Sequence, residues 1–408
     1  MPYGDQLALK QRSMEDLFAD WAPQGAVRPI LGMDDPFHYR NKVTSPFAPG
    51  RRIDPAESRG RSCRAYGRDG RTAGKGKAAR AAAPRHEILT GMYAAHSHRL
   101  VPTDACLLEN QQAKAVIAAV RDLMPRFGLL PYREDAHAGF VRHAVVRVGH
   151  ESGEVLVTLV TNGKEFPGSR AFCRELVRRC PFVTTVVQNV NLRQTNVILG
   201  EEERTLYGPG FILDTLCGLS FRISSHSFYQ VNAVQTEVLY RQAMELAGLA
   251  GTQTVVDAYC GTGTIGLVAA KSGAARVIGV DNVASAVRDA RQNARHNGVA
   301  NAEFVAADAG DFMCALAAQK SGCTPAADAR DVPASALTPA ADAESATALA
   351  PAVDIAGTPV PAPDVPTPAG DLVLFMDPPR AGASEAFLDA ACALAPERIV
   401  YISCNPET

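Results

Sequence analysis

Hydrophobic positions repeat with a different spacing in each part of the chain, and the spacing predicts the elements. Near the start, Leu7, Met14 and Phe18 recur at close to helical intervals, which predicts an amphipathic helix within residues 1–25. From 87 to 225, short β-rich runs alternate with helical runs, a pattern typical of an α+β domain. The β-rich runs are VRHAVVRVG, EVLVTLVT, TTVVQNV and NVILG, and the helical runs are QAKAVIAAVRDLM and SRAFCRELVRRC.

The second half of the chain alternates strand and helix in a different style. The apparent strands are VVDAY, VIGVD, AEFVAAD, LVLFMD and RIVYISC, with helical segments between them. This order favours an open parallel sheet. We therefore expect an α/β protein with two domains, an α+β domain at 1–225 and a parallel-sheet domain at 226–408.

Two stretches depart from these patterns. Residues 51–85 carry eleven Lys and Arg against three Asp and Glu, with few large apolar residues, so we expect a disordered basic insertion. It could contact RNA phosphates without fixed structure or be a solvated loop without function, and both interpretations stay open. Residues 317–370 are rich in Ala, Pro, Thr and Asp and predict a second disordered insertion.

Composition limits the class of protein. The 408 residues are 47% hydrophobic and carry a net charge of −2, so any contact with nucleic acid must come from local basic patches. No run of eighteen apolar residues predicts a membrane span, and the start of the chain lacks a signal-peptide pattern, so we expect a cytoplasmic protein. The ten cysteines include no CxxC pair, and most should be reduced.

A glycine-rich loop follows the strand VVDAY, in the segment DAYCGTGTIG. Gly261, Gly263 and Gly266 allow tight turns and a close approach of the backbone to a ligand where a helix begins. Asp281 ends the next strand, where a carboxylate can accept both ribose hydroxyls of a nucleoside. This context indicates a nucleotide site, but by itself it suits NAD as well as S-adenosylmethionine (SAM).

Two further features favour SAM. Asp257, inside the end of the first strand, could reach the amino-acid part of SAM or order the loop. The fourth strand ends in Asp377-Pro378-Pro379-Arg380, the type of motif with which methyltransferases hold a target base beside the methyl donor. A dehydrogenase has no use for this motif.

Cys404 follows the last apolar strand, in YISCNP. Carbon 5 of uracil is a poor nucleophile, but addition of a thiolate to carbon 6 converts the ring to an enolate that can accept a methyl group. A general base must then remove the carbon-5 proton so that the cysteine can leave. The plain alternative is that Cys404 is a small buried apolar residue. The neighbouring DPPR motif favours the nucleophile.

Together these motifs resemble the RNA uracil-5-methyltransferases, a SAM-dependent family that acts on 23S ribosomal RNA or on tRNA. DAYCGTGTIG, DPPRAG and YISCNPET carry the resemblance, and PFHYRNKV, VRHAVVR and SFYQVN add to it. It extends over most of 1–316 and 371–408. It implies a Rossmann-like SAM methyltransferase sheet preceded by an α+β RNA-binding domain.

The resemblance also assigns roles to single positions. Cys404 corresponds to the nucleophile, and the target uridine must flip out of its stack to reach it. The SAM-binding candidates are Gln230, Tyr259, Gly261, Gly263, Asp281, Asp308 and Asp377. The substrate-binding candidates are Arg40, Asn41, Lys42, Pro378 and Arg380, with Arg142 and His143 as further RNA contacts. The plain alternatives are a turn residue for Gln230, packing for Tyr259 and polar turns for the basic groups.

Several family features are missing from this chain. The resemblance implies a catalytic glutamate and two more strands after the nucleophile, yet Cys404 stands four residues from the end. Cys106 matches one ligand of the family's iron–sulfur cluster, but the other three cysteines are absent, so we expect a free thiol and no metal. We therefore expect a fragment shortened at both ends, which binds SAM weakly and turns over little.

Rival functions remain open at this point. A DNA cytosine-5-methyltransferase shares the cysteine chemistry, although its nucleophile usually follows the fourth strand. A non-catalytic RNA-binding protein would keep the fold without turnover, and a tRNA enzyme would differ only in its substrate. The context of Cys106 favours ribosomal RNA. Nothing in the sequence indicates an obligate protein partner or names the uridine.

Overall fold

The computed structural model describes residues 1–23, 25–52, 86–321 and 370–407. Most of the two predicted insertions lies outside the described residues, so their disorder stays a prediction. Their first residues are described, and there the predicted boundaries are wrong. Arg51 and Arg52 belong to a strand, and a helix extends through residues 317–320.

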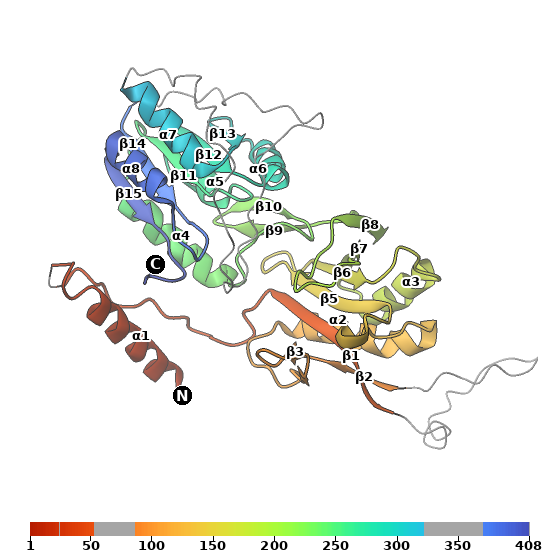
Figure 1. Ribbon diagram of the computed structural model, residues 1–408. Helices are drawn as coiled ribbons and strands as arrows, with labels where there is room; N and C mark the ends of the chain where they lie inside the picture. The colour runs from red at the N-terminus through yellow and green to blue at the C-terminus, as the bar shows by residue number, and fades with distance from the viewer. Residues whose placement is uncertain (24, 53–85, 322–369, 408) are drawn as a thin grey trace, which may run out of the picture.

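The first half of the chain forms a mixed sheet of six strands in the order β2-β1-β5-β6-β7-β8 (Figure 1). All neighbours are antiparallel except β6 and β7, which are parallel and joined by helix α3, Ser169–Arg179. The strands are β1 Lys42–Arg52, β2 His86–Thr90, β5 Val141–Val148, β6 Val155–Thr161, β7 Val183–Val190 and β8 Glu202–Tyr207. Two short strands, β3 Met92–Tyr93 and β4 Leu100–Val101, pair beside it.

One face of this sheet is covered by α3 and by α2, Gln111–Leu123. Asn110 begins α2, because its side chain accepts hydrogen bonds from the backbone nitrogens of Gln112 and Ala113. The apolar side of the helix then packs on alternate residues of β1 and β5, such as Val43 and Val146. The apolar residues that repeat every second position in the strands and those that repeat every 3.6 positions in the helix therefore share one buried core.

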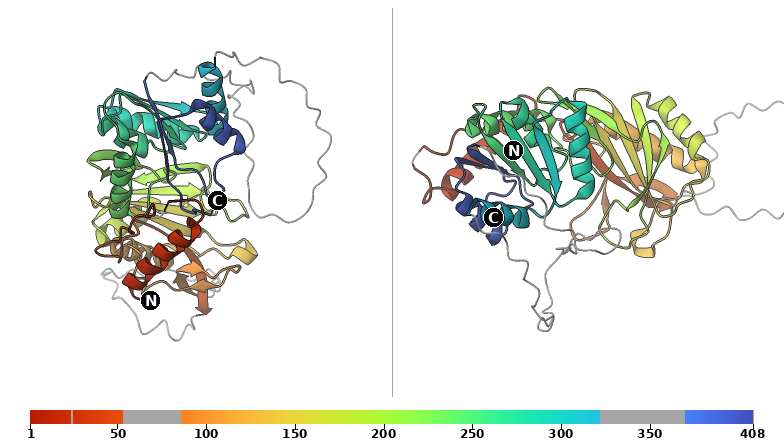
Figure 2. Two further views of the ribbon diagram at one scale, coloured as in Figure 1. Left: turned by 90° about the vertical axis from the view of Figure 1, so that its left-hand side faces the viewer. Right: turned by 90° about the horizontal axis from the view of Figure 1, so that it is seen from above.

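The second half forms a five-stranded, fully parallel sheet in the order β13-β12-β11-β14-β15. The strands are β11 Thr254–Ala258, β12 Arg276–Asp281, β13 Ala302–Ala306, β14 Leu372–Met376 and β15 Arg398–Tyr401. Alternate strand residues face opposite sides. Val255 and Val277 pack with α4 Ala233–Ala247, α5 Thr264–Lys271 and α6 Ala284–His296. Val256 and Ile278 pack with α7 Ala309–Lys320 and α8 Glu385–Leu394, which gives three layers (Figure 2).

A hairpin connects the two sheets. Its strands, β9 Ile212–Leu216 and β10 Leu219–Ile223, join through Cys217 and Gly218, which both have positive φ angles, 51° and 70°. Such a two-residue turn matches the twist of a hairpin. The hairpin shares a hydrophobic core with α4, α5 and α6 and also with Leu156 and Val187 of the first sheet. The domain boundary after residue 225 remains a prediction.

Helix α1, Tyr3–Leu17, confirms the predicted N-terminal helix but buries none of its residues. It folds back along the following segment, where the Tyr3 hydroxyl accepts a hydrogen bond from the nitrogen of Met33 at 2.8 Å. Trp21, beyond its end, is 87% exposed. In the described part of the chain no helix is long and apolar enough to cross a membrane.

The predicted fold class, including the parallel sheet, is confirmed, but single elements differ. NVILG is not a strand. The Asn191 amide donates there to the carbonyls of Val197 and Ile198, at 2.7 and 2.9 Å, so a side chain satisfies backbone groups that a strand would have paired. Strand β8, the hairpin and α4 were not predicted.

We predict that Phe172→Ala destabilises the protein by about 3–5 kcal/mol, because it empties a fully buried position in the core of the first sheet. The Phe172 ring contacts the rings of Phe127 and Phe166, with centroids 5.4 Å apart in both cases. Urea unfolding measures the change. Leu192→Ala, at a 59% exposed position, is the control and should cost about 0.5 kcal/mol or less. Equal losses in both variants would contradict this packing.

Candidate functional site

The glycine-rich loop between β11 and α5 is held by two carboxylates. Asp257, at the end of β11, accepts a hydrogen bond from the nitrogen of Gly266 at 2.7 Å. Asp281, at the end of β12, accepts from the nitrogens of Gly261 at 2.9 Å and Val283 at 2.8 Å. The loop is therefore ordered before any ligand binds, which lowers the entropic cost of binding.

Two glycines in this loop are required by their geometry. Gly261 has φ 54°, and the space where a Cβ would lie is open, so a ligand can approach the backbone. Gly263 has φ 80°, and a Cβ there would meet the Phe304 ring at 2.9 Å. Tyr259 holds φ 65° without being a glycine, a conformation that is uncommon and concentrates at ligand sites.

Buried carboxyl groups make this region electrostatically unusual. Asp257 is fully buried, and its Oδ1 has no hydrogen-bond partner among the described residues. Burial raises the pKa of Asp257 to about 8, with the nearby Asp377 and Asp281 adding to the shift and the Gly266 hydrogen bond opposing it. Burial also raises the pKa of Asp377 to about 6. Perturbed carboxyl groups of this kind are typical of functional sites.

Tyr259 and Asp308 lie on the side of the sheet that α7 and α8 cover. The Tyr259 ring contacts Phe387, with centroids 5.7 Å apart, and burial followed by Asp308 and Tyr401 raises the pKa of its hydroxyl. Asp308 begins α7, because its Oδ1 accepts from the nitrogens of Gly310 and Asp311 at 2.8 and 3.2 Å. Both therefore have structural contacts already, and their SAM contacts remain predictions.

Cys404 lies just beyond β15, the strand next to β14. The nitrogen of Ile402 donates to the carbonyl of Met376 at 2.8 Å, so the chain still runs beside β14 where Asp377 follows Met376. Cys404 comes two residues later and its thiol is exposed. Pro378 is buried, whereas Arg380 is exposed. Within the described residues the thiol is therefore accessible, and its role as nucleophile stays a prediction.

Gln230 and the predicted RNA-binding segment are joined by Asn41. The Asn41 amide donates to the carbonyl of Gln230 at 3.0 Å, and its backbone nitrogen donates to the carbonyl of Val231 at 2.9 Å. Asn41 is 7% exposed, so the structure gives it a role in joining the two halves of the chain. Contact of Asn41 with RNA stays a prediction.

Lys42 and Arg147 are direct cross-strand partners on β1 and β5. Burial, then Arg147 and Arg40, lower the pKa of Lys42, and burial lowers the pKa of Arg147 to about 10. Neither side chain forms an ion pair within the described ranges. Arg147 instead donates to the carbonyls of Ser225 and Ser227, at 3.2 and 2.6 Å. Exposed Arg40 extends this basic group toward solvent.

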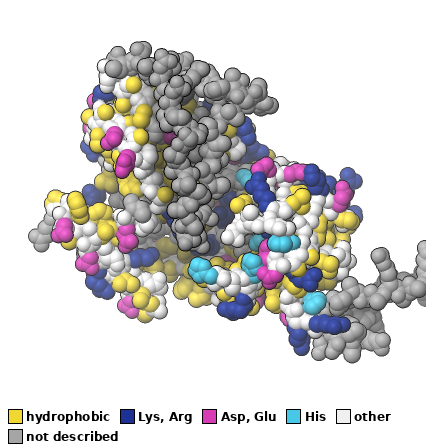
Figure 3. Space-filling model, in the orientation of Figure 1, with side chains coloured by type: hydrophobic (Ala, Val, Ile, Leu, Met, Phe, Trp, Pro, Cys, Tyr) yellow, Lys and Arg dark blue, Asp and Glu magenta, His cyan; other side chains and the backbone are white. Residues whose placement is uncertain are grey.

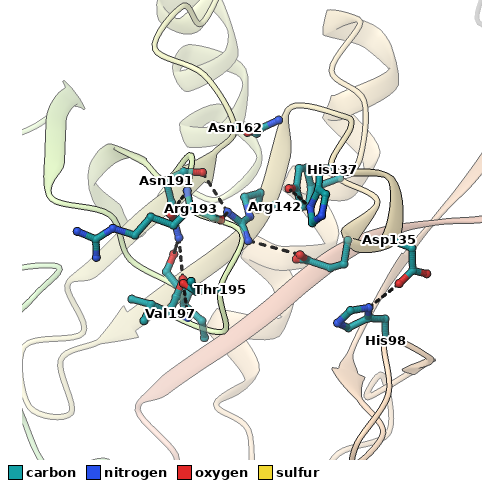
Figure 4. Close-up of polar contacts among 12 residues, drawn as sticks. His98, Asp135, His137, Arg142, Asn162, Asn191, Arg193, Thr195 and Val197 are labelled. Atoms are coloured by element: carbon teal, nitrogen blue, oxygen red, sulfur yellow. Dashed lines mark hydrogen bonds and ion pairs between the residues drawn. The ribbon is translucent and has the colours of Figure 1, made fainter. Parts of the chain in front are cut away.

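Arg142 and His143 do not face solvent, which contradicts the expectation that they contact RNA. Arg142 is 3% exposed and donates to the carbonyls of Asn191 and Arg193, at 3.1 and 2.7 Å, so it holds the loop after β7 (Figure 4). His143 is 7% exposed, and burial followed by Arg142 lowers its pKa to about 4. Both side chains therefore lie inside the fold, and Nδ1 of His143 has no hydrogen-bond partner among the described residues.

Cys106 is a free thiol of intermediate exposure. Its carbonyl accepts a hydrogen bond from the Lys114 ammonium at 3.2 Å, which fixes the backbone rather than the sulfur. Throughout the described ranges, no three His, Cys, Asp or Glu side chains are grouped so that they could hold a metal ion.

Phe228 is a residue of this region that was not predicted from the sequence. Its ring is 64% exposed, although its carbonyl accepts a hydrogen bond at 3.4 Å from the Thr262 hydroxyl in the glycine-rich loop. A large exposed aromatic side chain beside a cofactor loop can stack on a base. The signal available in the sequence was the aromatic pair Phe228-Tyr229 between polar residues in SSHSFYQVN.

Comparison with known proteins agrees with this geometry. Residues 250–323 match a family model described as a methyltransferase domain, and they contain the glycine-rich loop, Asp281 and Asp308. Uncharacterized RNA methyltransferases of Halalkalibacterium halodurans and Oceanobacillus iheyensis are each 34% identical to the chain. The alignments cover all of this chain and 71% and 72% of those proteins.

A solved structure has a similar fold along the whole chain. It is a tRNA (uracil-54, C5)-methyltransferase of Pyrococcus abyssi in complex with S-adenosyl-L-homocysteine, with a TM-score of 0.64 and 20% identity, covering 100% of this chain and 75% of that one. Fold and site together define a methyltransferase. On the identity to its bacterial relatives, the chain belongs to the family of RNA methyltransferases.

We predict that Asp257→Asn flattens the pH dependence of stability. The folded pKa of Asp257, about 8, lies above the ordinary aspartate value of about 3.9, so this group favours the folded state below pH 4 and that contribution is lost as pH rises through 8. Asparagine keeps an acceptor for Gly266 and cannot ionise.

Urea unfolding at pH 5 and pH 9 measures this effect. The free energy of unfolding of Asp257→Asn, relative to wild type, should be higher at pH 9 by at least about 1.4 kcal/mol, the equivalent of one pKa unit. Asp16→Asn, at an exposed position of α1, is the control and should leave the profile unchanged. Parallel profiles for Asp257→Asn and wild type would contradict a carboxyl group that is neutral at pH 7.

Proposed function

We propose that this RNA methyltransferase transfers a methyl group from SAM to carbon 5 of a uridine, with Cys404 as a covalent nucleophile. One observation carries the proposal. An exposed thiol and the Asp377 carboxyl group follow two neighbouring parallel strands, β15 and β14, and β11, which leads into the glycine-rich loop, lies beside β14. A methyl donor and a target base can therefore share this edge of the sheet.

The residues present fit SAM. Open space at Gly261 admits a ligand to the backbone, and the Asp281 carboxylate, which accepts from the Gly261 nitrogen, would be the acceptor for the ribose hydroxyls. The unpartnered Oδ1 of Asp257 is a further polar group beside the loop. Gln230, Tyr259, Gly263, Asp308 and Asp377 complete the proposed cofactor site. When bound, SAM supplies an electrophilic methyl group.

The protein's own side chains would perform the remaining steps. The Cys404 thiolate adds to carbon 6 of the uracil, forming an S–C bond and leaving an enolate whose carbon 5 takes the methyl group. A general base then removes the carbon-5 proton, and the electron pair expels the thiolate. Pro378 and Arg380, after Asp377, would hold the base against the thiol.

For the substrate we propose a uridine in ribosomal RNA, with tRNA as the rival. The context of Cys106 favours the ribosomal substrate, while the similar archaeal structure is named as a tRNA enzyme. Figure 3 shows Lys and Arg side chains in separate groups on the drawn face, between acidic and apolar ones. RNA contact therefore falls to local groups such as Arg40 and Lys42, next to Asn41.

We predict that RNA containing 5-fluorouridine forms a covalent complex with the protein when SAM is present. Fluorine at carbon 5 cannot leave as a proton does, so the Cys404 adduct should persist whichever group is the general base. Denaturing electrophoresis detects the complex. Ribosomal and tRNA transcripts, tested side by side, distinguish the two substrates.

Cys404→Ala should abolish the complex. Cys392→Ala, which removes another exposed thiol, is the matched control and should leave the complex intact. A complex of equal yield with Cys404→Ala would contradict its role as nucleophile. Failure of the wild-type protein to form one with either RNA would contradict uracil-5 chemistry.

We predict that Lys42→Met weakens RNA binding and stabilises the protein without RNA. Like charges directly opposite on neighbouring strands are unfavourable, so removing one from the Lys42–Arg147 pair should add up to about 1 kcal/mol to the free energy of unfolding. If Lys42 contacts one phosphate, a plot of the logarithm of the RNA association constant against the logarithm of the salt concentration should become less steep by roughly 0.7–0.9 in Lys42→Met.

Filter binding across a salt series and urea unfolding measure the two effects. Lys164→Met is the control, because Lys164 is exposed and paired with Glu202 at 2.6 Å. It should leave the salt slope unchanged. An unchanged slope for Lys42→Met would remove Lys42 from the RNA interface.

A further inference from the structure

The segment Ser225–Gln230 alternates between buried and exposed side chains. Ser225, Ser227 and Tyr229 are buried at 1%, 5% and 6% exposure, while His226 and Phe228 are exposed and Gln230 is half-buried. Successive side chains of an extended backbone point to opposite sides. The side that Tyr229 takes therefore determines the side on which Phe228 and Gln230 lie.

Tyr229 is fixed by a buried carboxylate on the hairpin. Its hydroxyl donates to Oδ2 of Asp214 on β9 at 3.3 Å, and its ring contacts Phe221 on β10, with centroids 6.5 Å apart. Burial, then Asp214, raises the pKa of the Tyr229 hydroxyl, which therefore stays protonated and can donate. This hydrogen bond joins the hairpin to the segment that contains Gln230.

Asp214 is itself held from the first sheet. It is 1% exposed, and its carboxylate accepts from the backbone nitrogens of His150, Glu151 and Ser152 at 3.0, 3.0 and 3.3 Å. These three nitrogens belong to the turn between β5 and β6. Charge-assisted bonds to three nitrogens hold a carboxylate in one orientation. The position of Tyr229 is therefore set by the first sheet through a carboxylate that cannot turn.

A second anchor prevents the segment from sliding. Asn41 holds the carbonyls of Gln230 and Val231, one and two residues after Tyr229. Asn41 fixes the backbone at Gln230 and Asp214 fixes the side chain of the residue before it, which sets the side of the segment on which the Gln230 side chain lies. A shift by one residue would bury Phe228 and Gln230 and expose Tyr229.

We propose that Asp214 and Tyr229 are positioning residues for cofactor binding: the carboxylate, through the tyrosine hydroxyl, keeps the Gln230 side chain aimed at the cofactor. The inference rests on the proposed function, since it takes Gln230 as a SAM contact. Both side chains are buried, so they act on the cofactor through Gln230. They transmit the geometry of the first sheet to the second, so a protein with a loosened anchor still folds but binds SAM less well.

The test is equilibrium dialysis with radiolabelled SAM on the full chain. Tyr229→Phe removes only the hydroxyl, and the Kd for SAM should rise roughly fivefold to tenfold while the thermal midpoint of the SAM-free protein stays within about 2 °C of wild type. Gln230→Ala should raise the Kd at least as much. The double variant should bind no more weakly than Gln230→Ala alone, because both changes remove the same contact.

Glu154→Ala is the matched control. Glu154 accepts a hydrogen bond from the nitrogen of Leu213, at 2.8 Å, at the same junction between the β5–β6 turn and β9, but it has no bond to Tyr229. Its Kd for SAM should equal that of wild type. If Glu154→Ala raises the Kd as much as Tyr229→Phe, the junction acts only as general support and the proposed positioning is wrong.

The remaining outcomes separate this inference from the proposed function. Wild-type affinity in Tyr229→Phe, or fully additive losses in the double variant, would overturn the positioning role and leave the SAM proposal standing. A wild-type chain that binds no SAM would overturn the proposed cofactor and this inference together.

Discussion

The structure depends on one constraint: five strands run parallel and therefore end at the same edge of their sheet. The ends of β11, β12, β14 and β15 carry, in this order, Asp257 one residue before the end of the strand, Asp281 at its last residue, and Asp377 and Cys404 just beyond it, up to 147 positions apart in the sequence. No single loop provides the site. The backbone pairing brings the strand ends together, and the connecting helices pack on the two faces of the sheet.

The structure also buries ionisable groups. Burial raises the pKa values of the Asp257 and Asp377 carboxyl groups. Lys42 lies opposite Arg147 on the neighbouring strand, and neither has a carboxylate partner among the described residues. Such groups lower the stability of the protein by itself. Buried ionisable groups are expected at sites where a charged nucleoside and a polyanion bind, because the bound ligand then supplies the countercharge that the protein alone does not provide.

The sequence was most informative where chemistry and periodicity coincide. The parallel strands, the glycine-rich loop and the position of Cys404 at a strand end could all be predicted, because apolar runs and short motifs are local properties. Arg142 and His143 were misjudged since both are polar residues in a strand, and only the structure shows that each side chain lies inside the fold. A polar residue in a buried strand cannot be told from an exposed one by its type alone.

Contacts between segments that are distant in the chain could also not be predicted from the sequence. Nothing in HESGE or LDTLC indicates that Asp214 caps the turn at His150–Ser152 and also holds Tyr229, since these pairings require the hairpin to lie against the first sheet. Yet this contact links the sheet proposed to bind RNA with the residue proposed to contact the cofactor. If RNA displaces the β5–β6 turn, Asp214 must move with its three nitrogen donors and Tyr229 must follow. Substrate binding and cofactor binding would then be coupled, because both act on the same buried carboxylate.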